Sequence, residues 1–497
     1  MSRPAGIWRW RLAGAGAIFL FCILLAFRLG VADRLFSRPG SAVVPVAPER
    51  TVGEAWLNIL QGGRKIGYAR RSTVRTGAGF GFSEELFMKI NTLGVVQPLI
   101  VRTEAGLAAD GRLRDFRFTL GSNLFRFSAQ GSLAGKRLTV RVGVPGEEAE
   151  RVIDLTEAPY LGGGILESVG TLGLKPGEAT TVSVFDPASL GQRPARITFL
   201  GEEPLRVMGS ERKVRKLSVE LLGVKQFAWV DPDGGVLREE GLLGIVLERA
   251  TREEALNGLE GALSADLTEI AAVTASQPIR DPASLKLLRV RLNGVAETTQ
   301  LALAGGRQGY EKGVLTIRRE PVAGPIGTEG GEGRGMNRYL AATPLVQADH
   351  PKLRDKAAAI VSPGDSDEAK AAKLVAWVHA NLKKVPVLSV PNALETLENL
   401  TGDCNEHAAL LAALARAAGL PADVEAGVVY LRGKFFYHAW NVIYLRNRGG
   451  WMTADAVLGQ MPADATHIRF VRGEADRQLD LVGLIGRLKL DILEMRE

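Results

Sequence analysis

The chain has 497 residues, enough for about three domains, and its 46% apolar and 24% charged residues are ordinary for a globular protein. The net charge of +7 is the difference between 62 Lys and Arg residues and 55 Asp and Glu residues, and the basic residues are spread along the sequence. Because no run of five or more basic residues occurs, the composition does not indicate a nucleic-acid-binding protein.

Residues 1–37 have the layout of a membrane anchor. The basic start MSRPAGIWRWR precedes an uncharged apolar stretch, Leu12–Phe27. The residues up to Val31 extend this stretch toward the roughly 20 residues that cross a bilayer. A signal peptide has the same layout, but no clear A-x-A site follows, which favours an uncleaved signal anchor. With the basic flank inside, we expect a single-pass protein of the inner (cytoplasmic) membrane, with most of the chain on the periplasmic side.

Residues 38–53 are rich in Pro, Gly and Ser and predict a linker. Short stretches of alternating polarity, separated by glycine-containing turns, then predict a large antiparallel β domain over 54–255. Turns are expected at Gly62-Gly63, at Ala109-Asp110-Gly111 and at Asp231–Gly235.

The glycine-rich stretch Tyr160–Gly173 contains neither G-x-G-x-x-G nor G-x-x-x-x-G-K-[ST], so it does not indicate a phosphate-binding loop. A loop or helix that crosses the sheet is expected there. Residues 280–325 predict a small β module, and residues 340–497 a C-terminal domain that begins with helices. Ser366 is the expected N-cap of one of these helices.

Three sequence blocks in the C-terminal domain carry reactive side chains. In TGDCNEHAALLAALARAAGL, Asp403 is a plausible N-cap that places Cys404 in the first turn of a helix, where the helix dipole favours a thiolate. The next block, VEAGVVYLRGKFFYHAWNVIYLRN, predicts a hairpin with His438 in its second strand. The third, GGWMTADAV, predicts another strand with Asp455 near its end. A thiol, an imidazole and a carboxylate make a nucleophile, a base and an orienting group.

These blocks, G-D-C-N-E-H-A, Y-H-A-W-N-V and W-M-T-A-D-A, resemble the transglutaminase-like core of bacterial and archaeal proteins. The resemblance covers about Ala369 to Gly473, and it implies a papain-like arrangement. It also implies that Cys404 is the nucleophile, His438 the base and Asp455 the residue that orients His438. The animal enzymes usually have an aromatic residue after the cysteine, whereas this chain has Asn405.

The fold class expected is α+β. It would comprise an N-terminal transmembrane helix, a large antiparallel β domain and a papain-like core. In that core the helix bearing Cys404 would pack on an antiparallel sheet bearing His438 and Asp455. The resemblance implies a cysteine peptidase or acyl transferase that forms a thioester from peptide or protein amides in the cell envelope, with hydrolysis favoured over cross-linking. The sequence indicates no cofactor, no metal and no nucleic-acid partner. The expected partners are a peptide or protein substrate and, through the N-terminal helix, the membrane.

Several alternatives stand beside this interpretation. A non-catalytic envelope protein could use the same cleft to bind peptide or to assemble with other proteins. Cys404 could be an inert buried thiol, although a lone cysteine in an exported region has no disulfide partner. Cys404, His407, His438 and Asp455 could bind zinc, but no second Cys-x-x-Cys or His-x-x-x-His element supports this. Trp440 is expected to pack in the core rather than to line the cleft, and no function is assigned to His350, His379 or His467.

Overall fold

The computed structural model describes residues 53–123, 125–143, 148–166, 173–259, 265–295, 301–326 and 335–497. The predicted anchor, residues 1–37, and nearly all of the predicted linker lie outside these ranges. Within them, no helix combines the length and the apolar character needed to cross a membrane. The predicted localisation as a single-pass inner-membrane protein is therefore not upheld. The segment on which it rested, Leu12–Phe27, lies outside the described residues.

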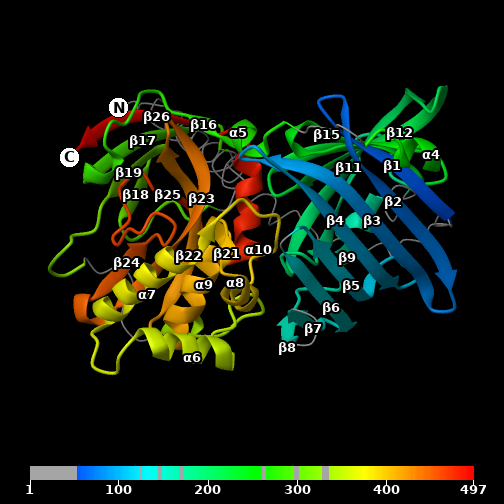
Figure 1. Ribbon diagram of the computed structural model, residues 1–497. Coiled ribbons are helices and arrows are strands. Elements are labelled where there is room, and N and C mark those ends of the chain that lie inside the picture. The colour runs from blue at the N-terminus through cyan, green and yellow to red at the C-terminus, as the bar shows by residue number, and fades with distance from the viewer. Residues whose placement is uncertain are drawn as a thin grey trace, which may run out of the picture. The chain divides into compact units, whose positions relative to one another are not determined.

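The first half of the described chain forms one 15-stranded sheet (Figure 1). Strands β1 to β8 follow one another as antiparallel neighbours, and β15 back to β10 do the same, with β9 parallel to β10 at one edge. The two series join where β1 pairs with β15. The strands are β1 Gly53–Gln61, β2 Arg64–Thr76, β3 Gly79–Thr92, β4 Val95–Leu107, β5 Leu113–Gly121, β6 Arg126–Ala134, β7 Arg137–Gly143, β8 Ala149–Asp154, β9 Tyr160–Leu161, β10 Ala179–Asp186, β11 Gly191–Val207, β12 Ser210–Leu221, β13 Val224–Val230, β14 Val236–Glu240 and β15 Ile245–Ala250.

The turns of this sheet lie where the sequence predicts them. Gly62 and Gly63 connect β1 to β2 with φ angles of 55° and 77°, which glycine adopts without strain. At the β13–β14 turn the Asp231 carboxylate accepts the N–H of Gly235 over 2.6 Å. Tyr160–Gly173 begins with β9 and the short 3-10 helix η1, Gly162–Gly164.

Three smaller sheets, one of them a two-stranded pair, and several helices make up the rest of the described chain. A five-stranded sheet has the order β16-β23-β22-β25, with β24 also paired to β23, and a four-stranded sheet has the order β18-β19-β17-β26. The strands are β16 Val273–Thr274, β17 Leu287–Asn293, β18 Gln308–Glu311, β19 Val314–Arg318, β20 Lys383–Lys384, β21 Thr401–Gly402, β22 Ala422–Leu431, β23 Lys434–Leu445, β24 Gly450–Ala454, β25 Ile468–Arg472 and β26 Lys489–Arg496. The helices are α4 Arg252–Leu256, α5 Leu267–Ala271, α6 Pro351–Ile360, α7 Asp367–Asn381, α8 Ala393–Asn399, α9 Cys404–Ala417 and α10 Ala475–Gln478. The 3-10 helices in this part are η3 Pro282–Ser284, η4 Met336–Tyr339, η5 Arg446–Arg448 and η6 Leu479–Leu484, while η2 Leu242–Gly244 precedes β15.

Helix α9 is the centre of this second part. Its residues from Glu406 to Arg416 are all buried, and it packs against β22 and β23 on one side and α6, α7 and α8 on the others (Figure 1). An Ala- and Leu-rich helix that is apolar all round suits such a position, because small side chains let neighbouring elements approach closely. The helix ends before Gly419, whose φ is 79°.

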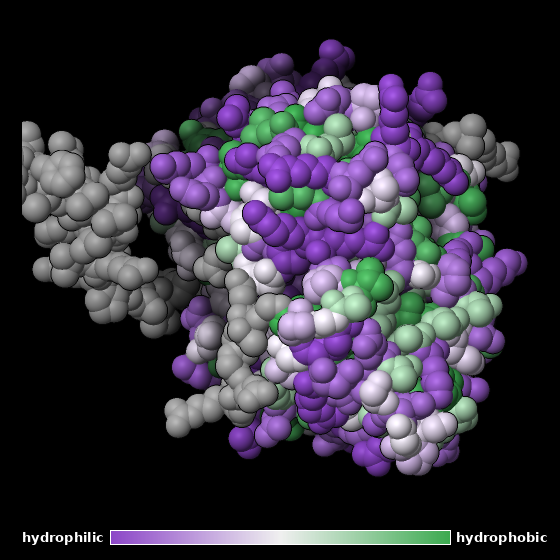
Figure 2. Space-filling view, turned by 90° about the vertical axis from the view of Figure 1, so that its left-hand side faces the viewer, coloured by the Kyte–Doolittle hydropathy of each residue, from purple (hydrophilic) through white to green (hydrophobic). Residues whose placement is uncertain are grey.

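The expected α+β class was wrong. Strands account for 49% of the described residues, and the helical part is small. Helical periodicity in the sequence is concentrated in residues 351–417, whereas the chain on either side of that region forms mainly strands. On the face shown in Figure 2, hydrophilic and apolar residues are interspersed, as on an ordinary protein surface.

Candidate active site

Cys404 is the first residue of α9, and the turn before it is tightly built. The Asp403 carboxylate accepts the N–H of Asn405 over 2.8 Å, and the Glu406 carboxylate accepts the N–H of Asp403 over 2.9 Å. This reciprocal capping box satisfies backbone donors that the helix itself leaves free. A Cβ atom at Gly402 would lie 2.3 Å from the Cβ of Glu406, so only glycine fits there.

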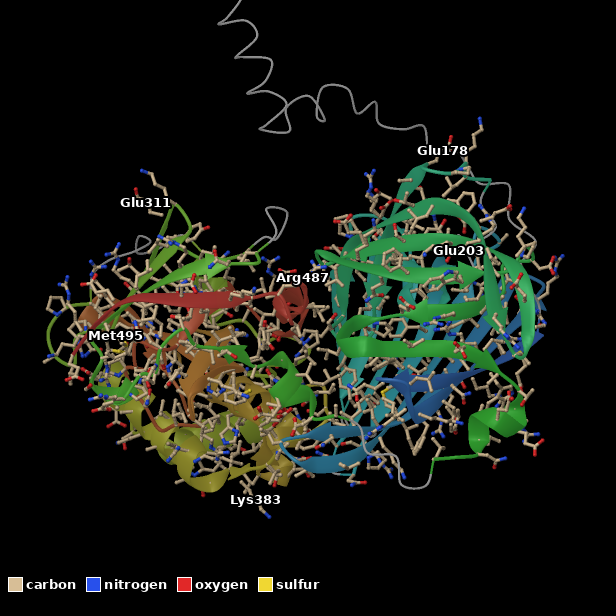
Figure 3. The ribbon with its side chains drawn as sticks, turned by 90° about the horizontal axis from the view of Figure 1, so that it is seen from above. Glu178, Glu203, Glu311, Lys383, Arg487 and Met495 are labelled. Carbon is tan, nitrogen blue, oxygen red and sulfur yellow. The ribbon has the colours of Figure 1, made fainter. Side chains whose placement is uncertain are left out.

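The chain that leads into Cys404 is held by a short parallel pair, in which Lys383 of β20 lies opposite Thr401 of β21. Ser389 adds a hydrogen bond from its hydroxyl to the Glu406 carboxylate. Figure 3 shows Lys383 pointing outward from this region. Segments from before and after α8 therefore hold the start of α9 in position.

Strand β23 brings the second block to the thiol. On the side away from β22, it pairs with β16 at Lys434 and Phe435 and with β24 from Asn441 onward. The described strands leave residues 436–440 unpaired on that side. The backbone N–H of Ala439 uses this opening to donate a hydrogen bond to the Cys404 thiol. The Cys404 thiol therefore lies next to the backbone of Ala439, the residue that follows His438.

His438 and Asp455 form a buried pair. Nε2 of His438 lies 2.8 Å from Oδ2 of Asp455, and the exposed fractions of the two residues are 8% and 0%. Asp455 directly follows β24, and its other oxygen accepts the N–H groups of Val457 and Leu458 at 2.7 and 3.0 Å. Since Nε2 of His438 is used by Asp455, Nδ1 is the nitrogen left to exchange a proton with a neighbouring group.

His467, to which the sequence assigned no function, belongs to the same cluster. Its Nε2 lies 3.0 Å from the same Oδ2 of Asp455, and its Nδ1 lies 3.2 Å from Oδ1 of Asp464. Burial works against a charged ring, but the hydrogen bonds to Asp455 and Asp464 outweigh it and raise the pKa of His467. Burial likewise opposes ionisation of Asp455, yet His438 and His467 hold its pKa well below the ordinary value. The spacing D-A-T-H is the one local signal that could have drawn attention to this residue.

The environment of Cys404 differs from the expectation based on the helix dipole. The residue is partly exposed, but burial of its thiol and the carboxylates of Asp403, Glu406 and Asp455 raise the pKa of Cys404 well above its usual range. The N–H of Ala439 works in the opposite direction. The neutral thiol is therefore favoured at rest, and a nearby base has to accept its proton before it can act as a nucleophile.

A layer of buried side chains supports the imidazoles. Trp440 stacks with His438 at a centroid distance of 6.2 Å and meets His467 edge to face at 5.1 Å. It is 1% exposed, so it is a core residue, as the sequence predicts. Its Nε1–H donates over 3.0 Å to Glu425, which also accepts from Arg469 and Arg472.

The remaining histidines have other partners. Nδ1 of His407 lies 2.6 Å from the backbone oxygen of Asp403, so this residue braces the helix start. Nδ1 of His350 accepts the N–H of Lys352 at the start of α6, and Nδ1 of His379 lies 3.0 Å from the oxygen of Ala456. Each of these rings therefore has a local contact.

The four-residue zinc set considered from the sequence is not assembled. Among the described residues, the group whose ligand atoms lie within 4.8 Å of one another consists of His438, Asp455 and His467, without Cys404 or His407. The hydrogen bonds described above already use each of these three ligand atoms. We therefore interpret the cluster as a hydrogen-bonded, proton-holding site.

Residues 354–456 match the family model of the transglutaminase-like superfamily, which confirms the resemblance of this part of the chain. The chain is also similar to several solved structures, among them the following three. A proposed cysteine protease from Cytophaga hutchinsonii is 16% identical, with 43% of this chain and 84% of that one covered and a TM-score of 0.27. The periplasmic domain of TgpA from Pseudomonas aeruginosa is 16% identical, with 39% and 91% covered and a TM-score of 0.23. A β-barrel-like protein with a domain of unknown function from Brucella abortus is 12% identical, with 40% and 95% covered and a TM-score of 0.32. These low TM-scores carry no argument about function. A comparison with curated protein sequences found no match.

Proposed function

We propose that Cys404, His438 and Asp455 are the catalytic triad of the transglutaminase-like domain that residues 354–456 of this chain form. The proposed enzyme acts on amide groups of peptides or proteins through a thioester at Cys404. One observation carries the proposal. The Cys404 thiol is hydrogen-bonded by the N–H of Ala439, the neighbour of His438, and Asp455 holds the far nitrogen of that same imidazole.

In the proposed reaction, Nδ1 of His438 takes the proton of the Cys404 thiol. The sulfur attacks the amide carbonyl carbon and forms a C–S bond, and the negative charge passes to the carbonyl oxygen. The backbone N–H of Cys404, at the positive end of α9, is a donor for this oxyanion. His438 then returns the proton to the nitrogen as the C–N bond breaks, which releases an amine and leaves a thioester.

In the second half, water attacks the thioester carbonyl while His438 takes its proton. The C–S bond breaks, and the products are a carboxylic acid and the regenerated thiol. An amine in place of water would give a new amide. Of these two outcomes we favour hydrolysis, and the masses of the products distinguish it from transfer to an amine. His438 returns the proton taken from water to the sulfur as the C–S bond breaks, and Asp455, ionised and hydrogen-bonded to Nε2, stabilises the positive charge that His438 carries within each half while it holds a proton.

The experiment uses the full chain with Cys22 replaced by Ser, so that Cys404 is the single thiol. Iodoacetamide labelling at neutral pH, followed by mass spectrometry, measures the reactivity of Cys404. Incubation with a peptide mixture, with and without an added primary amine, then shows by product mass whether water or the amine accepts the acyl group.

We expect Cys404→Ala to abolish both labelling and turnover, and His438→Gln to lower turnover by about a hundredfold or more. His350→Asn is the matched control, because it removes an imidazole that caps α6 and replaces it with another capping residue. Peptide turnover that survives in Cys404→Ala would contradict the proposal. A wild-type chain that binds peptide without cleaving it would favour the non-catalytic alternative.

A further inference from the structure

His467 is fully buried, and both of its ring nitrogens face carboxylates. Nε2 lies 3.0 Å from Oδ2 of Asp455, and Nδ1 lies 3.2 Å from Oδ1 of Asp464. A neutral imidazole carries one N–H, so it can donate to only one of these two oxygens. The second nitrogen would then direct its lone pair at a carboxylate.

Neither carboxylate has an oxygen free to carry a proton and donate it to that lone pair. The oxygens of Asp455 already face Nε2 of His438 and the N–H groups of Val457 and Leu458. The oxygens of Asp464 accept the N–H and the hydroxyl of Thr466 over 2.8 and 2.6 Å, and Oδ2 accepts from the Gln460 amide over 3.0 Å. Two carboxylates that only accept hydrogen bonds need a ring between them that only donates.

Other charged groups lie farther from His467. The Arg307 guanidinium donates to the backbone oxygen of His467, and Glu320 pairs with Arg307. Behind Trp440, Glu425 pairs with two arginines. The titratable and charged groups that face His467 from the packed elements are therefore Asp455, Asp464, His438, Arg307, Glu320, Glu425, Arg469 and Arg472. Because Arg307 and the two arginines of β25 each have a carboxylate partner, the charges nearest to the ring are those of Asp455, Asp464 and His438.

We propose that His467 is a positioning residue of the proposed triad, an imidazolium held between Asp455 and Asp464 that keeps Asp455 against His438 and sets the pH range in which the site is reactive. The inference rests on the function proposed above. The His467 ring is 5.9 Å from the His438 ring, centroid to centroid, and acts on the reacting atoms only through Asp455.

The charges of the cluster explain why Asp455 needs both His467 and Asp464 beside it. A single imidazolium beside Asp455 would cancel the negative charge that His438 requires when it takes up the thiol proton. Asp464 supplies a second negative charge on the far side of His467, so the three groups together keep one net negative charge. His467 can therefore orient Asp455 without removing its charge.

The main experiment measures the rate of Cys404 alkylation against pH in the full chain carrying Cys22→Ser. His467→Gln keeps a hydrogen-bond donor but removes a positive charge, so the thiolate becomes less stable. We expect the midpoint of the labelling profile to move upward by roughly one pH unit. Asp464→Asn removes a negative charge and should move the midpoint downward by a smaller amount, because Asp455 still holds the charged ring. The double variant should return toward the wild-type midpoint.

His350→Asn serves again as the control and should leave the profile unchanged. A merely structural role for His467 predicts lower labelling in both single variants without shifts of opposite sign. Profiles that do not shift, or that shift in the same direction, would overturn the inference. Efficient labelling of Cys404 in the wild-type chain would at the same time leave the proposed function standing, so the two can fail separately.

A second measurement reads the protonation of the histidine rings directly in the wild-type chain. The chain has five histidines, so ring nitrogen-15 NMR spectra of the labelled wild-type chain contain few signals. We expect one histidine to keep protons on both ring nitrogens to a higher pH than the other histidines do, above the ordinary titration of the side chain. The assignment to His467 follows from the signal that His467→Gln removes. A spectrum in which every histidine becomes neutral within the ordinary titration range of the side chain would contradict the proposal.

Discussion

Asp403 and Glu406 together cap the start of the helix that carries Cys404. The Asp403 carboxylate accepts the N–H of Asn405, and the Glu406 carboxylate accepts the N–H of Asp403. The same two carboxylates are among the groups that raise the pKa of the Cys404 thiol. The carboxylates that stabilise the start of α9 therefore also oppose the negative charge that the Cys404 sulfur carries as a thiolate. The first prediction separates these two effects.

Asp403→Asn should keep the cap and remove the charge, because Asn is as good an N-cap as Asp. We expect the pH midpoint of Cys404 labelling to move downward and the midpoint of urea unfolding to stay unchanged. Asp403→Ala should also lower the labelling midpoint but lose about 1 kcal/mol of stability with the cap. A labelling midpoint that rises in Asp403→Asn would show that the carboxylate does not oppose the thiolate.

Glu395 of α8 predicts a stability that depends on pH. Burial raises the pKa of this carboxyl to about 7, although the N–H of Arg126, 3.0 Å away, lowers it. Because the folded state holds its proton more tightly than the unfolded state, the folded chain loses stability as pH rises from about 4.5 to about 7. Glu395→Gln keeps an acceptor for Arg126 and cannot ionise.

We therefore expect Glu395→Gln to be more stable than the wild type at about pH 8, by about 1–3 kcal/mol, and equally stable at about pH 4.5. Urea unfolding at both pH values measures this. Glu311→Gln is the control, since Glu311 projects into solvent from the β18–β19 hairpin (Figure 3) and its side chain is 84% exposed. Equal stability of Glu395→Gln and wild type at both pH values would contradict the prediction.

Glu425 predicts a loss of stability in acid. Burial disfavours its charge, but Arg472 and Arg469 outweigh this and lower the pKa of Glu425 to about 2. The ionised Glu425 therefore stabilises the folded state at pH values above about 4.5, the pKa of the unfolded chain. This contribution disappears as the pH falls from about 4.5 to about 2. Glu425→Gln leaves two guanidinium groups without their shared anion, so we expect it to cost about 3–5 kcal/mol at neutral pH.

Trp440→Phe is the informative comparison for Glu425, because it removes the indole N–H donor while both arginines stay paired. We expect this variant to lose about 1–3 kcal/mol, which is less than the loss in Glu425→Gln. Chemical unfolding at about pH 7 measures both variants. If the two losses are equal, the arginine pairs contribute nothing beyond the indole hydrogen bond.

The sequence by itself determined the features that depend on neighbouring residues. Gly62-Gly63 and Asp231–Gly235 place two hairpin turns, and Asp403 marks the start of α9, because turn conformation and capping are local properties. The third block also placed Asp455 near the end of a strand; in the structure it directly follows β24 and lies 2.8 Å from His438 of β23. The fold class failed because helical periodicity over one short region was given too much weight.

Only the tertiary structure decided the electrostatics of the site. The helix position of Cys404 favours a thiolate in the sequence, but burial and three carboxylates reverse that preference once the chain folds. His467 has an unremarkable sequence context, and its two carboxylate partners come together only when β24, β25 and the loop between them are packed. Burial and the distances between charges depend on which segments meet in space, and these quantities set the protonation of the groups proposed to react.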